Sequence, residues 1–334
     1  MATLDDVARR AGVAASTVSR VLNETRFVSE ATKARVLKAV AEVGYTPNTL
    51  ARSLARSRTN VVGLVMSSTR NRFFADIINA IEQECSRLGM MVLLANTDDH
   101  PDRETDAVAA LHQRRVDGVI MTPTCHPDSG AMGYLGEKGI PTILVDRLLG
   151  SNFDGVGIEN YRSMQRLVTY LIGLGHRRIG FLSGQREFTT AQERQLGYRD
   201  TLLATGIEPH DELISTGNVD LDMAKQEATR IIQQHGVTAF IGGNNLTTIG
   251  IMLAAKELRR NVPADLAVVG FDDFDWVDAF QPRLTVMAQP CQEIGRIAAS
   301  LLLRRLAQPA SDVQIVRLDP QFVIRDSCGA AVAR

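Results

Sequence analysis

The sequence predicts an α plus α/β protein: a small helical head, a short hinge helix, and a two-lobed α/β body with parallel sheets. Three observations lead to this fold class. Apolar residues recur at helical spacing in the N-terminal segment, and from Val61 onward short apolar runs alternate with helical stretches. The pattern of the body also repeats along the chain. A chain of 334 residues has room for about two domains of ~150 residues and a small head.

The first two predicted helices surround a short turn at Gly12. Thr3 stands at the N-cap position of the first helix, ahead of two aspartates that favour the positive end of the helix dipole. Two helices around a tight turn, the second with small and polar residues outward, are typical of a helix-turn-helix motif. The apolar stripe comprises Leu4, Val7, Ala8 and Ala11 on the first helix and Val18, Val21 and Leu22 on the second.

A third helix follows, for which Ser29 is the predicted N-cap. Spacing alone does not separate a helix-turn-helix from an ordinary helical hairpin with solvated charges, so the segments that follow have to decide. The residues expected on the buried side of the third helix are Val36, Leu37, Val40 and Val43.

Four runs in order, TLDDVARRAGV, STVSRVLN, GYTPN and LARSLA, resemble the lactose-repressor (LacI/GalR) family of bacterial transcription regulators. The resemblance continues to the C-terminus and implies a periplasmic-binding-protein-like body. It further implies a cytoplasmic, nucleoid-associated repressor that reads a near-palindromic operator as a homodimer. Whether a bound effector releases DNA or promotes its binding is left open.

The second helix is expected to enter the major groove of DNA. Ala15 can make apolar contact with a thymine methyl, Ser16 is permissive, and Arg20 can bridge guanine N7 and O6 or clamp a phosphate. Backbone phosphates are the expected partners of Thr17, Ser19 and Asn23. The resemblance adds Thr3, Tyr45, Asn48 and Ala51 to the expected DNA contacts.

Residues 47–59 are expected to form the hinge helix, capped by Asn48. A helix of about ten residues is marginal alone in water, so it should order only against its dimer mate and DNA. By resemblance, Leu54 would wedge into a minor-groove step and kink the duplex. The alternative is a flexible basic linker without insertion. The apolar face that favours the wedge comprises Leu50, Ala51, Leu54 and Ala55.

Charge is distributed unevenly along the chain. Residues 1–60 hold ten Lys or Arg against five acidic residues, an excess of +5, whereas the whole chain has a net charge of -1. A basic head on a mildly acidic body is expected when only the head meets phosphate. The near-neutral total argues against a membrane-surface or general polyanion binder.

The sequence of the body contains an internal repeat. Gly63 and Gly180 are 117 residues apart, as are Gly89 and Gly206, and each pair has a matching context. We therefore expect two similar lobes with parallel sheets, because near-continuous apolar strands between helices are buried on both faces. The expected domains are 1–46 (helix-turn-helix), 47–59 (hinge) and 60–334 (effector binding and dimerisation), with lobes of roughly 60–159 plus 290–320 and 160–289 plus 321–334.

Polar residues at the predicted strand ends point to a cleft between the lobes, since ligands of such sheets bind beyond the carboxyl ends of the strands. Carboxylates, an arginine and amides together suit a polyhydroxylated effector, a sugar or sugar acid. Singly, an aspartate after a strand is often only a turn former, and each aromatic could be plain core. Arg70, Arg72 and Arg147 could attract an acidic sugar, although solvated surface arginines are the commoner explanation. The expected effector contacts are Asn71, Phe73, Phe74, Asp146, Phe188, Arg194, Asn244, Asp272, Trp276 and Gln289.

Other classes of protein fit less well. A solute-binding protein of a sugar transporter would share the body, but it would carry a signal peptide and no head. An enzyme is disfavoured because no GxGxxG, GxxxxGK[ST], GxSxG or HExxH is present, and no cofactor or metal is expected. The four cysteines are scattered and indicate reduced thiols. Without apolar heptads near the C-terminus, a dimer rather than a tetramer is expected.

Overall fold

The computed structural model describes residues 2–23, 26–45, 58–126, 129–150, 152–215, 220–274 and 281–329. The chain divides into two compact units, Met1–Thr59, which contains the head, and Asn60–Arg334, the body. The hinge residues Asn48, Ala51 and Leu54, and Trp276, lie outside the described residues. None of the described helices is both long enough and apolar enough to cross a membrane.

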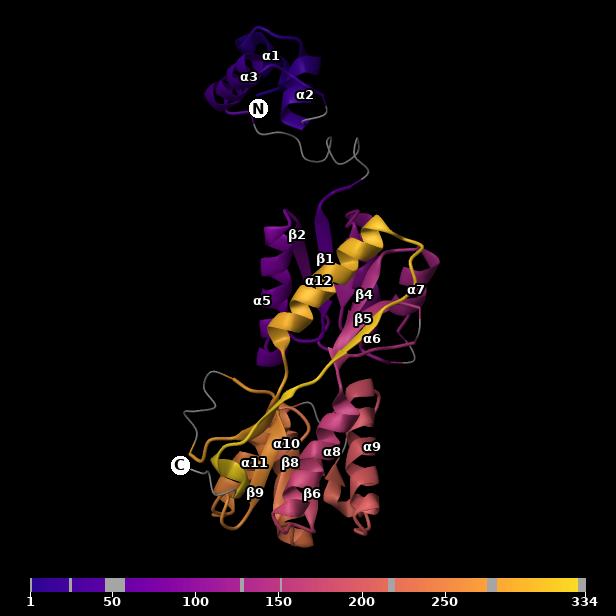
Figure 1. Ribbon diagram of the computed structural model, residues 1–334, viewed down its shortest axis with the longest axis vertical. Helices are drawn as coiled ribbons and strands as arrows, with labels where there is room; N and C mark the ends of the chain where they lie inside the picture. The colour runs from indigo at the N-terminus through magenta and orange to yellow at the C-terminus, as the bar shows by residue number, and fades with distance from the viewer. Residues whose placement is uncertain are drawn as a thin grey trace. The chain divides into compact units, whose positions relative to one another are not determined.

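The head contains three helices: α1 (Leu4–Ala11), α2 (Ala15–Asn23) and α3 (Glu30–Val43) (Figure 1). The predicted N-cap of α1 is confirmed, because Thr3 and Asp6 form a reciprocal capping box. Gly12 ends α1 with φ 65°, a left-handed conformation that glycine adopts without steric cost. The fully buried core residues, Val7, Val18 and Val36, come one from each helix.

Two details of α3 differ from the prediction. Leu37 is 49% exposed, and Ala39 is buried in its place, because the buried stripe runs through Val36, Ala39 and Val40 at three- and four-residue spacing. Ser29 occupies the N-cap position, but its hydroxyl donates to the Thr32 hydroxyl rather than capping a backbone N–H.

The first lobe of the body is built on a six-stranded parallel sheet. Helix α12 packs against α5 and crosses β3, β4 and β5, and α6 contacts β1 and α7. Helix α12, which comes late in the chain, therefore covers the middle strands of the first lobe (Figure 1). In sheet order, the strands are β11 (Ile315–Leu318), β5 (Asp154–Ile158), β4 (Thr142–Val145), β3 (Gly118–Met121), β1 (Val61–Met66) and β2 (Met91–Asn96); the helices are α5 (Arg72–Arg87), α6 (Pro101–Gln113), α7 (Ala131–Glu137) and α12 (Cys291–Ala307).

The second lobe repeats this order, with one exception: its edge strand β12 pairs antiparallel with β10. Helix α8 packs on α9, and α10 packs on α11. In sheet order, the strands are β12 (Gln321–Val323), β10 (Thr285–Ala288), β9 (Ala267–Phe271), β8 (Ala239–Gly242), β6 (Ile179–Leu182) and β7 (Ile214–Ser215); the helices are α8 (Asn160–Gly173), α9 (Thr189–Ala204), α10 (Leu221–His235) and α11 (Asn245–Glu257), with short 3-10 turns at Asp211–Leu213 and Asp326–Cys328.

The matching sheets account for the repeat in the sequence. Gly63 lies in β1 and Gly180 in β6, strands at equivalent places in the two sheets. Gly89 and Gly206 follow α5 and α9, both with left-handed φ (72° and 75°). The predicted two-lobed α/β body with mainly parallel sheets is confirmed.

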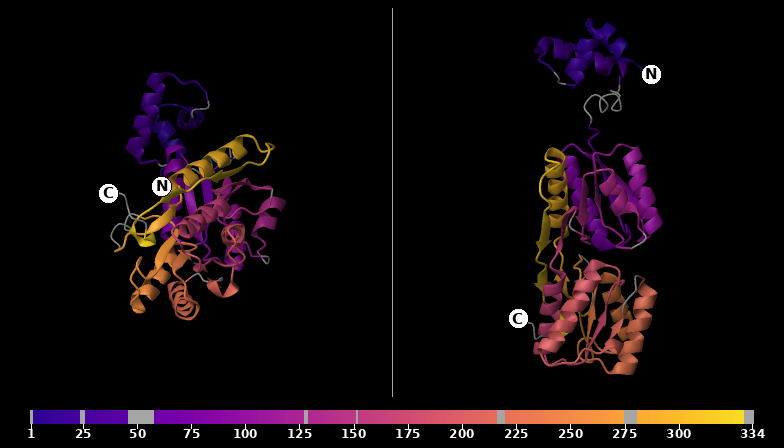
Figure 2. Two further views of the ribbon diagram at one scale, coloured as in Figure 1. Left: turned by 60° about the horizontal axis from the view of Figure 1, so that its bottom comes forward. Right: turned by 90° about the vertical axis from the view of Figure 1, so that its right-hand side faces the viewer.

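The chain passes between the lobes three times in the described residues: from β5 to α8, from β10 to α12, and from β11 to β12 (Figure 2). In both lobes the carboxyl ends of the central strands face the space between the lobes, as parallel sheets at a crossover require.

Candidate functional site

Helix α2 presents the face that the sequence predicted for DNA. Ser16 and Arg20 are exposed, while Thr17 and Ser19 are partly buried. Ala15 is also partly buried and packs against the core of the head. Among the α2 side chains that the structure describes, Ser16 and Arg20 are the exposed ones.

Other predicted DNA contacts have structural roles in the head. Thr3 is exposed but its side chain is engaged in the capping box of α1. Tyr45 packs partly buried against the head core, and its N–H donates to the Val40 carbonyl. Asn23 ends α2, and its side chain lies outside the described residues.

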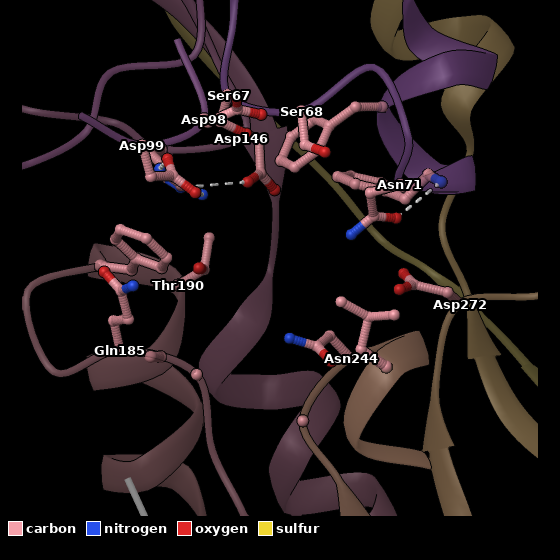
Figure 3. A pocket seen from close by; sticks show the side chains of 18 of the residues that line it. Ser67, Ser68, Asn71, Asp98, Asp99, Asp146, Gln185, Thr190, Asn244 and Asp272 are labelled. Atoms are coloured by element: carbon pink, nitrogen blue, oxygen red, sulfur yellow. Dashed lines mark hydrogen bonds and ion pairs between the residues drawn. The ribbon is translucent and has the colours of Figure 1, made fainter. Parts of the chain in front are cut away.

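Between the two lobes lies a cavity of about 460 Å³. Figure 3 shows side chains reaching into it from both lobes: Asp146 and Asn71 from the first lobe, and Asn244 and Thr190 from the second. Every predicted effector contact in the described part of the chain lines this cavity: Asn71, Phe73, Phe74, Asp146, Phe188, Arg194, Asn244, Asp272 and Gln289.

Two aspartates occupy equivalent positions in the two lobes. Asp146 follows β4 directly and Asp272 follows β9 directly, and both have left-handed backbone conformations (φ 67° and 76°). Non-glycine residues adopt this region uncommonly, so the surrounding structure must hold each carboxylate in place.

The two carboxylates differ in their partners. Asp272 accepts hydrogen bonds from the backbone N–H of Asn245 (3.0 Å) and from Gln289 Nε2 (2.5 Å). The nearest charged group to the Asp146 carboxylate is the Arg147 Nε, 3.9 Å away, and within the described residues this carboxylate accepts no hydrogen bond. Asp146 is therefore the carboxylate with acceptor capacity left for a ligand.

Arg194 lies in the second turn of α9. It is 6% exposed, its Nε donates to Asn160 Oδ1 (2.8 Å), and its guanidinium donates to the Gly243 carbonyl. The guanidinium also stacks on the ring of Phe271, 3.9 Å from the ring centroid. These contacts fix Arg194 rigidly at the cavity wall.

Amide side chains connect the lobes. Asn71 caps α5 by accepting from the Phe73 N–H (3.1 Å), and the same oxygen accepts from Asn245 Nδ2 of the other lobe (2.6 Å). Asn244 caps α11 through Thr247. The predicted contacts Asn71 and Asn244 thus shape the cavity through helix capping as well as lining it.

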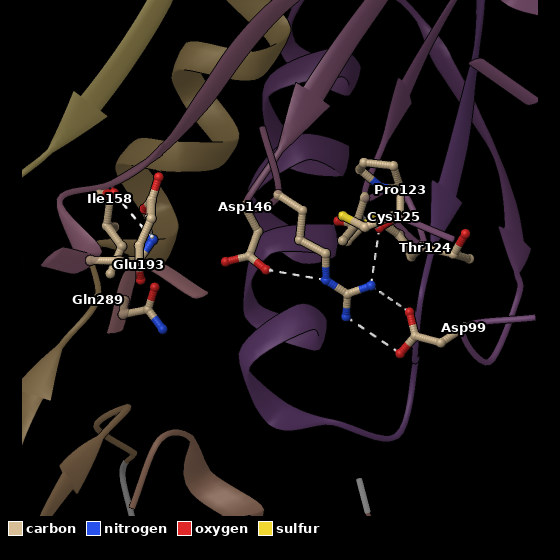
Figure 4. A network of polar contacts seen from close by, with 12 residues as sticks. Asp99, Pro123, Thr124, Cys125, Asp146, Ile158, Glu193 and Gln289 are labelled. Carbon is tan, nitrogen blue, oxygen red and sulfur yellow. Dashed lines mark hydrogen bonds and ion pairs between the residues drawn. The ribbon is translucent and has the colours of Figure 1, made fainter. Parts of the chain in front are cut away.

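Sequence reasoning missed the role of Arg147. The interpretation of this residue as a solvated surface arginine is wrong, because it is 4% exposed. It pairs with Asp99 (Nη1–Oδ1 2.5 Å) and donates to the Pro123 carbonyl (3.0 Å) (Figure 4). It also lies over the ring of Phe188 in the other lobe, 3.5 Å from the centroid. Asp99 lies shortly after β2, much as Asp146 follows β4. The expectation that polar residues at strand ends line the cavity could therefore have identified Asp99.

Burial shifts the pKa values of the ionisable side chains in the cavity wall. Desolvation raises the pKa of Asp146 to about 6, although Arg147 and Arg194 oppose the shift. Desolvation also raises the pKa of Asp272, against the opposing effects of Arg194 and the hydrogen bonds from Gln289 and Asn245. The pKa of Arg194 is lowered by desolvation and partly restored by the two aspartates. The cavity therefore favours a ligand that compensates buried carboxylates.

Among the described residues, no group of His, Cys, Asp and Glu side chains is arranged to hold a metal ion. The described cysteines are free thiols.

Comparisons with known proteins place both units. Residues 3–48 match the family model "Bacterial regulatory proteins, lacI family", and residues 59–321 match "Periplasmic binding proteins and sugar binding domain of LacI family". The chain is 34% identical to the HTH-type transcriptional repressor PurR of Vibrio vulnificus over 332 residues, 98% of each chain, and 34% identical to the PurR of Serratia proteamaculans over 331 residues, 98% of this chain and 97% of the relative.

Solved structures of transcription regulators also match this chain. A complex of the transcriptional regulator CelR with cellobiose matches with a TM-score of 0.75 and 30% identity, covering 98% of this chain and all of that one. A lac repressor dimer bound to operator and the anti-inducer ONPF matches with a TM-score of 0.87 and 26% identity, covering 98% and 99%. The family models together match most of the chain, and the relatives match nearly all of it. The chain therefore belongs to the LacI family of bacterial regulatory proteins, and it is a DNA-binding transcriptional regulator rather than an enzyme or a transporter's solute-binding protein.

Proposed function

We propose that this protein is a cytoplasmic repressor that binds a near-palindromic operator as a homodimer and senses a sugar or sugar acid in the cavity between its lobes. The observation that supports this most is the placement of two buried carboxylates, Asp146 and Asp272, on opposite lobes of one cavity. Carboxylates accept hydrogen bonds from vicinal hydroxyls, and Arg194 and the amides can donate. The related CelR was solved with cellobiose, a sugar.

We assign DNA recognition to residues 1–46, the hinge to 47–59, and effector binding and dimerisation to 60–334. On α2, the exposed Ser16 and Arg20 would reach base edges together with Ala15. Phosphate contacts would come from Thr17, Ser19 and Asn23, with support from Thr3, Tyr45, Asn48 and Ala51. Leu54 would wedge into the minor groove. One head offers few base contacts, which is why a twofold dimer is needed.

The proposed mechanism has two states. Asn71 and Asn245 join the lobes by a hydrogen bond, and Arg147 reaches across to Phe188. A ligand that contacts both walls stabilises one lobe arrangement over the other in proportion to its differential affinity. In a dimer, this arrangement would set the spacing of the two hinges and so decide whether they can pair on the operator.

The experiment that tests the proposal is a thermal-shift screen of the full chain against sugars, sugar acids, sugar phosphates and nucleobases. A ligand at one hundred times its Kd adds about 2.7 kcal/mol to stability, which is readily measured. A sugar that shifts the melting temperature and changes operator affinity supports the proposal. Stabilisation by nucleobases alone, or a ligand that leaves operator affinity unchanged, contradicts it.

A further inference from the structure

The guanidinium of Arg147 is buried in the cavity wall, and several groups of the protein contact it. The Asp99 carboxylate accepts two hydrogen bonds from it, Nη1 to Oδ1 at 2.5 Å and Nη2 to Oδ2 at 3.3 Å, and the Pro123 carbonyl accepts a third (3.0 Å). Its remaining nitrogen, Nε, faces Asp146 at 3.9 Å. Figure 4 shows Asp99, Pro123 and Asp146 arranged around this one group. Asp99 therefore pairs with the charge of Arg147, and three of the five N–H donors of Arg147 are used within the protein.

The loop after β2 positions Asp99. Asp98 and Asp99 are consecutive residues in the left-handed region (φ 50° and 58°), a conformation that costs free energy for residues with side chains. Thr97 is fully buried and anchors the loop by hydrogen bonds to the Met66 carbonyl and from the His100 N–H. A strained pair of aspartates held by a buried anchor indicates that the position of Asp99 is specific.

Several hydrogen-bond acceptors on the cavity wall remain for a ligand. Asp146 is a buried carboxylate, and Gln289 Oε1 and Ser67 Oγ are buried without a hydrogen-bond partner in the described structure. The Arg194 guanidinium donates to Asn160 and to the Gly243 carbonyl, both uncharged, and keeps N–H donors for a ligand hydroxyl. The lining as a whole carries five carboxylates against four guanidinium groups.

An anion in this cavity would face two buried carboxylates, Asp146 and Asp272, whereas among the described lining residues Arg194 is the one buried guanidinium that no ion pair neutralises. A hydroxyl group can donate to a carboxylate or to an amide oxygen, whereas an ionised carboxylate or phosphate can only accept. Burying a charge without a partner is far more costly than burying a hydrogen-bonded hydroxyl.

We propose that Asp99 determines ligand specificity: by neutralising Arg147, it restricts the cavity to uncharged, hydroxyl-rich sugars and excludes sugar acids and sugar phosphates. This deepens the proposed function and rests on it. Asp99 acts through Arg147 as a positioning and charge-compensating residue. Loss of its charge would expose the guanidinium of Arg147 as a site for an anion.

The test compares the full-length wild type with Asp99→Asn by calorimetric titration at pH 7.5. Asparagine tolerates the left-handed backbone, so the loop is retained. Asp98→Asn is the charge-matched control: Asp98 has the same backbone conformation and also lines the cavity, but it pairs with the exposed Arg103 and not with Arg147. The double variant Asp99→Asn/Arg147→Met removes the guanidinium as well. Probes are inorganic sulfate and the pairs glucose and glucuronate, and galactose and galacturonate.

We expect the wild type and Asp98→Asn to bind each anion about tenfold or more weakly than Asp99→Asn does, and the double variant to lose the gain. Tight, Arg147-dependent binding of sulfate or a uronate by the wild type would overturn the assignment, and so would equal anion binding by wild type and Asp99→Asn. If Asp99→Asn does not fold, Asp99→Gly, which also tolerates the left-handed backbone, replaces it with the same expected gain in anion binding.

The same data separate this inference from the proposed function. If no sugar in any panel binds the wild type, the sugar-sensing proposal fails, while the sulfate titrations still report whether Asp99 masks Arg147. If a uronate is the tightest wild-type ligand, the sugar-sensing proposal stands and the role of Asp99 in excluding acids is refuted.

Discussion

Replacement of Asp146 by asparagine tests the electrostatics of the cavity most directly. Burial raises the pKa of Asp146 from 3.8 to about 6, so between these values the folded protein binds more protons than the unfolded chain. Below pH 3.8 the carboxyl is protonated in both states and its contribution to stability is fully present. That contribution is lost as the pH rises through 6. A shift of about two pKa units corresponds to about 3 kcal/mol.

The assay is urea unfolding of the ligand-free full chain between pH 4 and 7.5, followed by the fluorescence of its one tryptophan, Trp276. Asp146→Asn cannot ionise, so the difference in unfolding free energy between wild type and variant isolates Asp146. We expect the wild type to lose about 3 kcal/mol relative to Asp146→Asn across this range, less if water enters the cavity. A difference that is independent of pH, or that favours the wild type as the pH rises, would refute the assignment of Asp146 as a desolvated carboxylate.

Four further predictions follow from the geometry. Gly295→Ala would place a methyl group 2.4 Å from a β-carbon of α5, so it should cost about 1–3 kcal/mol, whereas Gly173→Ala meets nothing within 4 Å and should stabilise by about 0.4–1 kcal/mol; urea unfolding of both variants distinguishes packing from propensity. Arg20→Ala should abolish discrimination between operator and random DNA while the body keeps its melting temperature; unchanged operator affinity would remove Arg20 from the groove. Asp272→Ala should eliminate the effector response but not DNA binding, and a variant that still responds normally would place the ligand elsewhere. Leu54→Ala should weaken specific binding more than nonspecific binding, and an equal loss of both argues against the wedge.

The sequence predicted the parts of the site that depend on periodicity and strand order. Asp146 and Asp272 were expected at the cavity because the carboxyl ends of parallel strands meet at one edge, and the 117-residue repeat indicated two such edges. The buried face of α1 followed from helical spacing in the same way. These features are local or periodic, so one chain is enough to reveal them.

Other features depend on tertiary contacts that no local pattern encodes. Arg147 becomes buried only because the loop after β2 brings Asp99 against it, 48 positions away in the chain. Leu37 satisfies the helical spacing of α3, yet the small head leaves no neighbour to cover it. The hydrogen bond between Asn71 and Asn245 joins residues 174 positions apart. Such pairings are decided by the whole fold.

The interleaving of the lobes has a consequence for biosynthesis. The sheet of the first lobe is completed by β11, and its face is covered by α12, so this lobe remains unfinished until the ribosome has made the last part of the chain. The edge of the second lobe, β12, is made later still. The head needs only contacts among neighbouring helices and can form early, since local contacts form faster than distant ones. A nascent chain therefore carries a folded DNA-reading head well before it has a cavity to control it.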